Sequence, residues 1–295
     1  MTPQNAAVVG HPIGHTMSPF IQERLFALSG IPVRYRVIDV PDLAKAFPQL
    51  LRELDCFNVT IPYKSELLDY VHTSSLWART CGSANTVKVD HDGPEGDFSY
   101  ADTTDGPGAA LSLSHHGLDL NRELVILGHG GAAKAIAFEA AKRPGFRLTF
   151  VHREGSGHNA MYQAGMLADC ARGQGDKDFR VKVMSYQELE ADLGGRYELL
   201  VNATSVGMHP HPDACPVSEQ VIARSQAVFD VVYNPRETLL LKRARQLGVQ
   251  AVGGMGMLVC QAAYSHKIWY GTEFNPQDLL QLIEDAEAEL ARKFG

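Results

Sequence analysis

The stretch LVILGHGGAAKAIAFEA, residues 124–140, decides the fold of this chain. An apolar run suited to a buried strand is followed by a glycine-rich turn and a helix-forming segment. Gly128, Gly130 and Ala133 satisfy the spacing G-x-G-x-x-G/A, which gives a tight turn, close approach to a pyrophosphate and close helix packing. The helix N-terminus would stabilise the anion. The stretch therefore predicts a dinucleotide-binding domain that begins well inside the chain.

Apolar runs alternate with helix-like segments after this stretch, for example at residues 134–143 and 237–248. Short apolar strands that alternate with helices are typical of a parallel sheet covered on both faces. We therefore predict a Rossmann-like, doubly wound domain. Its expected strands are residues 124–128, 146–152, 179–185, 197–203, 227–233 and 249–254.

The residues before the glycine turn alternate in the same way and predict a second α/β domain. Expected strands are residues 6–10, 33–39, 57–61 and 84–90, and expected helices are residues 18–28, 43–54 and a segment after Pro62. Polar strings stand at the strand ends: GHPIGHTMSP, NVTIPYK, SANT and ADTTDG. Because open α/β sheets bind ligands beyond the carboxyl ends of their strands, these strings indicate a small-molecule site.

Composition narrows the function classes. A chain of 295 residues with 45% hydrophobic and 21% charged residues suits two globular domains. A net charge of −7 disfavours binding to nucleic acid or to an anionic membrane. The five cysteines stand at least 25 residues apart, so neither a metal site nor a disulfide framework is expected. The uncharged run 246–265 predicts a buried strand and a buried helix.

The N-terminal string MTPQNAAVVG lacks a basic region followed by an apolar run. We therefore expect no signal peptide and a cytoplasmic protein.

Arg153 bears on the choice of cofactor. It follows the strand after the glycine turn, where an NAD-binding domain usually carries Asp or Glu for the ribose 2′-hydroxyl. A guanidinium there suits a 2′-phosphate, which it can bind through two charge-assisted hydrogen bonds. The sequence favours NADP, and Glu154 beside Arg153 leaves NAD open.

Six strings together resemble the shikimate dehydrogenase family over nearly the whole chain. They are HPIGHTMSP (11–19), NVTIPYK (58–64), TDG (104–106), GHGGAAK (128–134), NATSVGM (202–208) and GGMGMLVCQAA (253–263). The resemblance implies a substrate domain at residues 1–106, to which residues 255–295 return, and an NADP domain at residues 107–254. It also implies a role in chorismate and aromatic amino acid biosynthesis, and a monomer or homodimer.

The resemblance implies roles for individual residues. Lys64 would be the general acid/base and Asp105 its partner, because reduction of a ketone needs a proton for the oxygen as well as a hydride. Substrate contacts would come from Thr16 and Ser18 for the carboxylate, and from Thr60, Asn85, Tyr233 and Gln261 for other groups. Cofactor contacts would come from Gly128, His129, Gly130, Gly131 and Ala132 for the pyrophosphate, Arg153 for the 2′-phosphate, and Thr204, Val231 and Gly254 near the nicotinamide.

Departures from the family pattern keep alternatives open. Thr16 replaces a usual serine, and HREGSGH lacks the later basic residue of the NADP clamp. A dehydrogenase for quinate or an aminated shikimate, with NADP or NAD, is one alternative. A non-catalytic NADP-sensing module is another, although a sensor needs no proton-transfer pair such as Lys64 and Asp105. Ser18 could instead serve only as a helix N-cap.

Overall fold

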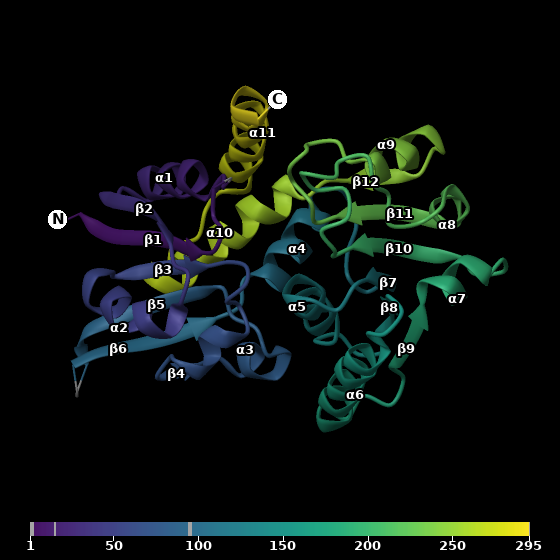
Figure 1. Cartoon of the computed structure of the whole chain (residues 1–295), viewed down its shortest axis with the longest axis horizontal. Helices are drawn as coiled ribbons and strands as arrows, with labels where there is room; N and C mark the ends of the chain where they lie inside the picture. Colours follow the sequence, from purple (N-terminus) through teal and green to yellow (C-terminus); the bar gives the residue numbers. More distant parts are fainter. Residues whose placement is uncertain (1–2, 15, 94–95, 295) are drawn as a thin grey trace. The chain divides into compact units, whose positions relative to one another are not determined.

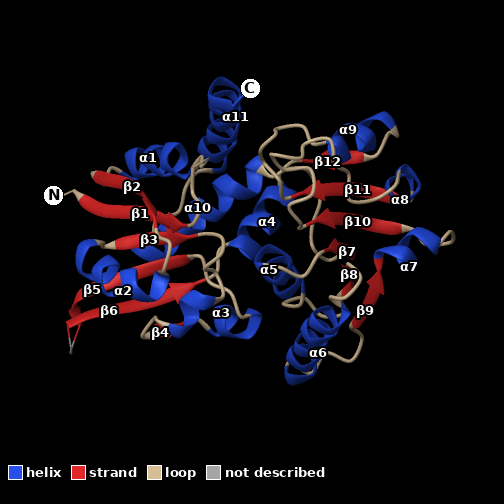
Figure 2. Ribbon diagram, viewed as in Figure 1, coloured by secondary structure: helices blue, strands red, loops and turns tan. Residues whose placement is uncertain are grey.

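The computed structural model describes residues 3–14, 16–93 and 96–294, which form helices and strands joined by loops and turns (Figures 1 and 2). The chain divides into two compact units. The first consists of Met1–Gly108 and Val259–Ala288, and the second of Ala109–Leu258 and Glu289–Gly295. The division lies two residues beyond the expected boundary. The return to the first unit starts at Val259 instead of residue 255, and the last residues group with the second unit.

In the part of the chain that is described, the first unit holds a six-stranded sheet of order β2-β1-β3-β5-β6-β4. β1 is parallel to β2 and β3, β5 is antiparallel to β3 and β6, and β4 is parallel to β6. The strands are β1 (Gln4–Gly10), β2 (Val33–Asp39), β3 (Cys56–Val59), β4 (Thr73–Ser74), β5 (Thr86–Gly93) and β6 (Gly96–Asp102). The helices are α1 (Ser18–Ser29), α2 (Leu43–Glu53), the 3₁₀ turn η1 (Glu66–Asp69), α3 (Leu76–Cys81), α4 (Asp105–Ser114), α10 (Met255–Tyr270) and α11 (Pro276–Phe294), of which α4, α10 and α11 cross the division between the units.

Alternating side chains give this sheet a core on each face. Phe57 of β3 points to the face covered by α2, where it packs against Phe47. The preceding residue, Cys56, points to the opposite face and clusters with Phe26 of α1 and Trp269 of α10. Side chains that alternate between two covered faces are what a strand buried on both sides requires.

The expected helix after Pro62 is wrong. Residues 61–65 form a turn, and the single 3₁₀ turn η1 follows before β4. The Lys64 carbonyl accepts the Ala84 amide at 2.7 Å, so it is taken out of the hydrogen-bond ladder that a helix would need. Tyr63 is buried at the same time, and its hydroxyl donates to the Val40 carbonyl. These contacts present Lys64 on a short turn instead of a helix. The strands β4 and β6 were not predicted.

The second unit confirms the predicted doubly wound fold. Within the described residues its sheet has six strands in the order β12-β11-β10-β7-β8-β9, and every pairing is parallel. The strand order reverses between β7 and β10, the position at which such sheets bind ligands. The strands are β7 (Glu123–Leu127), β8 (Arg147–His152), β9 (Arg180–Ser185), β10 (Tyr197–Asn202), β11 (Ser225–Asp230) and β12 (Gln250–Val252). The helices are α5 (Gly131–Ala140), α6 (Gly157–Gly173), α7 (Tyr186–Ala191), α8 (Glu219–Ala223) and α9 (Leu239–Gln246).

The uncharged run 246–265 forms β12 and the first part of α10, as predicted. In the described ranges, no helix is both long and apolar enough to cross a membrane.

Candidate functional site

Three strand ends meet at one edge of the first unit's sheet. Asn58 at the end of β3 pairs with Thr86 at the start of β5, and Thr86 pairs with Asp102 at the end of β6. Asn85 lies between these ends: its carbonyl accepts from Val59 at 2.8 Å, and its amide donates to Asp102 at 3.0 Å. The backbone therefore holds the Asn85 side chain in a fixed place at this edge.

Lys64 and Asp105 form an ion pair beside Asn85. The Lys64 Nζ lies 2.5 Å from the Asp105 Oδ2, and the two side chains are 21% and 5% exposed. Asp105 is the first residue of α4, where the helix N-terminus stabilises a negative charge. The Asp105 carboxylate is thus buried, and its charge is compensated by Lys64 and the helix N-terminus. The Lys64 side chain is partly exposed, so its ammonium can reach a ligand.

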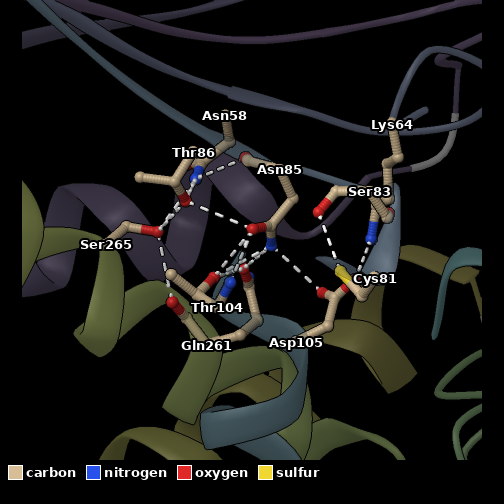
Figure 3. A network of polar contacts seen from close by, with 10 residues as sticks. All are labelled: Asn58, Lys64, Cys81, Ser83, Asn85, Thr86, Thr104, Asp105, Gln261 and Ser265. Carbon is tan, nitrogen blue, oxygen red and sulfur yellow. Dashed lines mark hydrogen bonds and ion pairs between the residues drawn. The ribbon is translucent and has the colours of Figure 1, made fainter. Parts of the chain in front are cut away.

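The side chain of Asn85 connects this pair to α10 (Figure 3). Its Nδ2 lies 2.9 Å from the Thr104 Oγ1, 3.0 Å from the Asp105 Oδ1 and 3.1 Å from the Gln261 Oε1. Its Oδ1 accepts from the Thr104 amide at 2.8 Å. The Thr104 hydroxyl can in turn donate to the Gln261 Oε1 at 3.1 Å, so these side chains form a connected polar cluster whose hydrogen bonds a ligand hydroxyl can join. Gln261 can come this near because Gly108 has no Cβ to overlap it.

A deeper layer of polar groups, which the sequence reasoning missed, supports Asn85. Asn58 donates to the Thr86 Oγ1 at 3.2 Å and to the Ser265 Oγ at 3.0 Å, and it accepts from Gln22 at 2.8 Å. His266 lies 3.0 Å from Gln22, and burial lowers the pKa of its imidazole to about 4. The signal was present: Asn58 is a polar residue inside the apolar strand CFNV.

Thr60 directly follows β3, while Thr16 and Ser18 stand at the start of α1, which follows β1 in the chain. The Thr60 methyl group packs so closely on Gly10 of β1 that a Cβ there would lie 2.5 Å away. The Thr16 Oγ1 accepts from the Ser18 amide at 3.1 Å. Ser18 is the first residue of α1 and not its cap, since Met17 holds the N-cap position without a capping hydrogen bond from its own side chain. The N-cap alternative for Ser18 is therefore wrong.

Tyr233 belongs to the second unit, three residues after β11, and burial raises the pKa of its hydroxyl. It is not among the groups that the first unit brings together.

The glycine turn has the geometry that a pyrophosphate site needs. Gly128 has φ of +96°, and a Cβ there would lie 2.9 Å from the Thr204 Cγ2. Gly130 is the N-cap of α5 and has no side chain that caps the first turn, which contains Gly131 and Ala132. The amides of that turn therefore point to the place where a phosphate would bind.

Predicted nicotinamide contacts gather at the carboxyl ends of β10, β11 and β12. A Cβ at Gly254 would overlap the Val231 carbonyl, and the Val231 amide donates to Asn202 at 3.0 Å. The Thr204 Oγ1 donates to the Asn202 Oδ1 at 2.6 Å. Asn202 in turn donates to the Asp230 side chain at 2.9 Å. The buried Asp230 carboxylate therefore connects the ends of β10 and β11, from which the two loops start.

Asp230 was missed as a residue that organises this region. Its side chain also accepts from the Val232 amide at 3.1 Å and from the Thr238 hydroxyl at 2.6 Å. Burial raises the pKa of its carboxyl to about 6 despite these hydrogen bonds. An acidic residue inside the apolar string AVFDVVY was the signal.

Arg153 is exposed one residue beyond β8, and within the described residues its guanidinium has no ion-pair partner. It can therefore bind a phosphate. No group of His, Cys, Asp and Glu in the described part of the chain has the arrangement of a metal site.

Comparisons with known proteins agree with this geometry. Residues 8–87 match the family model described as the shikimate dehydrogenase substrate binding domain. Shikimate dehydrogenase (NADP(+)) of Caldanaerobacter subterraneus is 35% identical over 280 residues, which cover 94% of this chain and 95% of that protein. The enzyme of the same name from Methylobacterium radiotolerans is 36% identical over 296 residues and 97% of each chain.

The crystal structure of shikimate 5-dehydrogenase from Thermus thermophilus in complex with NADP(H) and shikimate superposes with a TM-score of 0.81. It is 26% identical in sequence and covers 96% of this chain and 99% of its own. Two relatives above 30% identity match almost from end to end, and this structure shares the arrangement of strands and helices. The chain belongs to the shikimate dehydrogenase family.

Proposed function

We propose that this protein reduces 3-dehydroshikimate to shikimate, reversibly, with NADPH. The observation that carries the proposal is the Lys64–Asp105 ion pair, joined through Asn85 to Gln261 at one sheet edge. Lys64 is partly exposed and Asp105 is buried, which suits a group that exchanges a proton with a ligand beside a group that orients it.

In the reduction, the Lys64 Nζ gives a proton to the carbonyl oxygen of the substrate. When bound, the reduced nicotinamide supplies the hydride that the carbonyl carbon accepts. The C=O bond thus becomes CH–OH and the cofactor becomes NADP⁺. Asp105 keeps the ammonium directed at the oxygen, and Lys64 regains its proton from solvent. In the reverse direction Lys64 accepts the hydroxyl proton.

The other polar groups suit a carboxylated ring with several hydroxyls. We assign the substrate carboxylate to the hydroxyls of Thr16 and Ser18, because Thr16 accepts one hydrogen bond and keeps its proton to donate. Thr60, Asn85 and Gln261 are assigned to ring hydroxyls. An unpaired buried donor or acceptor costs about 1–3 kcal/mol, so a ligand without hydroxyls would bind poorly. The role of Tyr233 remains a prediction, as do the cytoplasmic location and a monomeric or homodimeric state.

The second unit fits NADP. Gly128 and the first turn of α5 suit the pyrophosphate, and Arg153 is open to the 2′-phosphate. Thr204, Val231 and Gly254 are assigned to the nicotinamide side because they follow the carboxyl ends of β10, β11 and β12, on one side of the point where the strand order reverses.

An absorbance assay at the nicotinamide band tests the proposal, with shikimate and quinate each offered NADP⁺ and NAD⁺. We expect the highest kcat/KM for shikimate with NADP⁺. A preference for quinate, or for NAD⁺, would assign the protein to the alternative dehydrogenases. Cofactor binding without turnover of either acid would favour the sensing module.

A further inference from the structure

The sequence that follows Arg153 supplies no second strong base. From residue 154 to residue 171 it contains neither lysine nor arginine, and Glu154 follows Arg153 directly. A dianionic phosphate is bound most strongly by more than one cationic donor. The partner for Arg153 must therefore come from another segment.

The pairing of β7 with β8 brings the glycine turn to this place. The two strands are parallel with Leu127 opposite Val151, and the Gly128 amide donates to the Val151 carbonyl at 2.8 Å. Beyond this pairing, His129 follows β7, while His152 ends β8 and Arg153 follows it. His129 and Arg153 therefore follow neighbouring strands at the same edge of the sheet, and the charge of Arg153 acts on the His129 imidazole.

The imidazole of His129 lies in a cluster of cations. Burial lowers the pKa of His129, and the charges of Lys134, His152 and Arg153 lower it further. Lys134 stands in α5, while His152 and Arg153 stand at the end of β8. Glu188 of α7 interacts electrostatically with His152 of this cluster, and Glu154 follows Arg153 in the sequence. In the protein without a bound anion, burial and these charges accordingly favour the neutral form of His129.

His152 is less suited to bind the phosphate. Its Nδ1 lies 2.9 Å from the Arg153 carbonyl oxygen, and its ring packs on Gly157, where a Cβ would lie 2.8 Å from the Cε1. The ring is therefore fixed against the start of α6. His129 is part of the turn that faces the cofactor.

We propose that the imidazole of His129 is the second ligand of the 2′-phosphate, beside Arg153, and that it binds in the protonated form. This inference rests on the proposed use of NADP. A dianion next to His129 offsets the repulsion from Lys134, His152 and Arg153 and favours the imidazolium. Binding of the 2′-phosphate is thereby coupled to uptake of one proton, and the coupling is reciprocal. The preference for the phosphorylated cofactor should increase as the pH falls.

Calorimetric binding to the full-length protein tests this without turnover. The probes are adenosine 2′,5′-bisphosphate and adenosine 5′-monophosphate, which differ only in the 2′-phosphate, at pH 8.5 and pH 6.5. A phosphate has a second pKa of about 6, so the probe stays largely dianionic at both values. We expect the wild type to bind the bisphosphate at least roughly fivefold more tightly at pH 6.5, since uptake of one full proton changes the affinity about tenfold per pH unit. The monophosphate should bind almost equally at both.

Variants separate the imidazole from the rest of the site. His129→Ala should lose the pH dependence, and His129→Gln, which keeps a polar side chain, should also lose it while it retains the affinity at pH 8.5. His158→Ala, an exposed histidine at the start of α6, should behave as the wild type. Equal pH dependence in the wild type and both His129 variants would overturn the inference and leave NADP use intact. If the wild type binds the bisphosphate and the monophosphate equally, both the role of His129 and the proposed use of NADP are wrong.

Discussion

The Lys64 Nζ and the Asp105 Oδ2 lie 2.5 Å apart, and the carboxylate is the more deeply buried member of the pair. Asp105 is further held by Asn85 at 3.0 Å and by the N-terminus of α4. The pair therefore has a fixed anion and an ammonium that can reach a ligand. This asymmetry suits Lys64 as the proton donor and Asp105 as the group that directs it.

Replacement of Asp105 tests the directing role. Asp105→Asn keeps the shape of the side chain but removes the charge that orients Lys64. A hydrogen bond to a charged group is worth about 1.5–3 kcal/mol, so kcat/KM should fall roughly 10- to 150-fold. Steady-state kinetics with shikimate and NADP⁺ measure this. Asp97→Asn makes the same swap on the β5–β6 hairpin, where the carboxylate pairs with His91, and should retain full activity.

Thr16 should influence the choice between two acids. Its hydroxyl accepts from the Ser18 amide at 3.1 Å, and a serine can make the same bond, so Thr16→Ser removes only a methyl group. Shikimate carries its carboxylate on a flat carbon, whereas quinate has a tetrahedral carbon with an extra hydroxyl. A methylene-sized change is worth about 10- to 200-fold. We expect a native preference for shikimate that Thr16→Ser narrows; a wider preference in the variant would refute the steric explanation.

Arg153 should set the preference for NADP over NAD. Arg153→Ala is expected to raise the KM for NADP⁺ about tenfold or more, since a charge-assisted hydrogen bond to the 2′-phosphate is lost. The KM for NAD⁺ should change little. Arg172→Ala removes an exposed arginine further along α6 and serves as the control. Equal increases for the two cofactors would show that Arg153 does not bind the 2′-phosphate.

Asp230 should make the second unit less stable as the pH rises. Its pKa is about 6 in the folded protein and 3.8 in its ordinary state, so the folded protein binds more protons between these values. Stability is therefore lost as the pH rises from about 4 to about 6, by an amount on the order of 3 kcal/mol. Asp230→Asn should remove this loss.

The measurement is urea unfolding of both proteins between pH 4 and pH 8. His266 works in the opposite direction over a similar range, because its pKa is lowered to about 4. The quantity to compare is consequently the difference between wild type and variant. A difference that does not change with pH would contradict the assignment.

Local sequence was sufficient for the cofactor turn. The determinants of the bend at Gly128 and of the start of α5 lie within one stretch, and the structure places both where the pattern predicts. The strands of the second unit could also be predicted, because local apolar runs mark them. β11 ends at Asp230, before the expected residue 233, because the buried carboxylate turns the chain through its bonds to Val232 and Thr238.

Long-range polar contacts could not be predicted in this way. Asn85 meets Gln261 across 176 positions of sequence, and His266 meets Gln22 across 244. Contacts between such distant residues leave no periodic pattern in the sequence. Lys64 and Asp105 could be paired from the sequence only through the resemblance to the family. The turn at Lys64 was misjudged because its carbonyl bonds to Ala84 of another segment. Polar residues inside buried strands, such as Asn58 and Asp230, were the unused local signals.

Turnover by Lys64→Ala tests the central claim most directly. Loss of a general acid/base group costs about 10²–10⁴ in rate, so kcat should fall by that factor while NADPH binding, followed by fluorescence titration, stays unchanged. Lys45→Ala, which removes an exposed lysine of α2, should match the wild type in both measurements. If Lys64→Ala keeps more than about half of the wild-type kcat, Lys64 does not transfer the proton and the proposed mechanism is wrong.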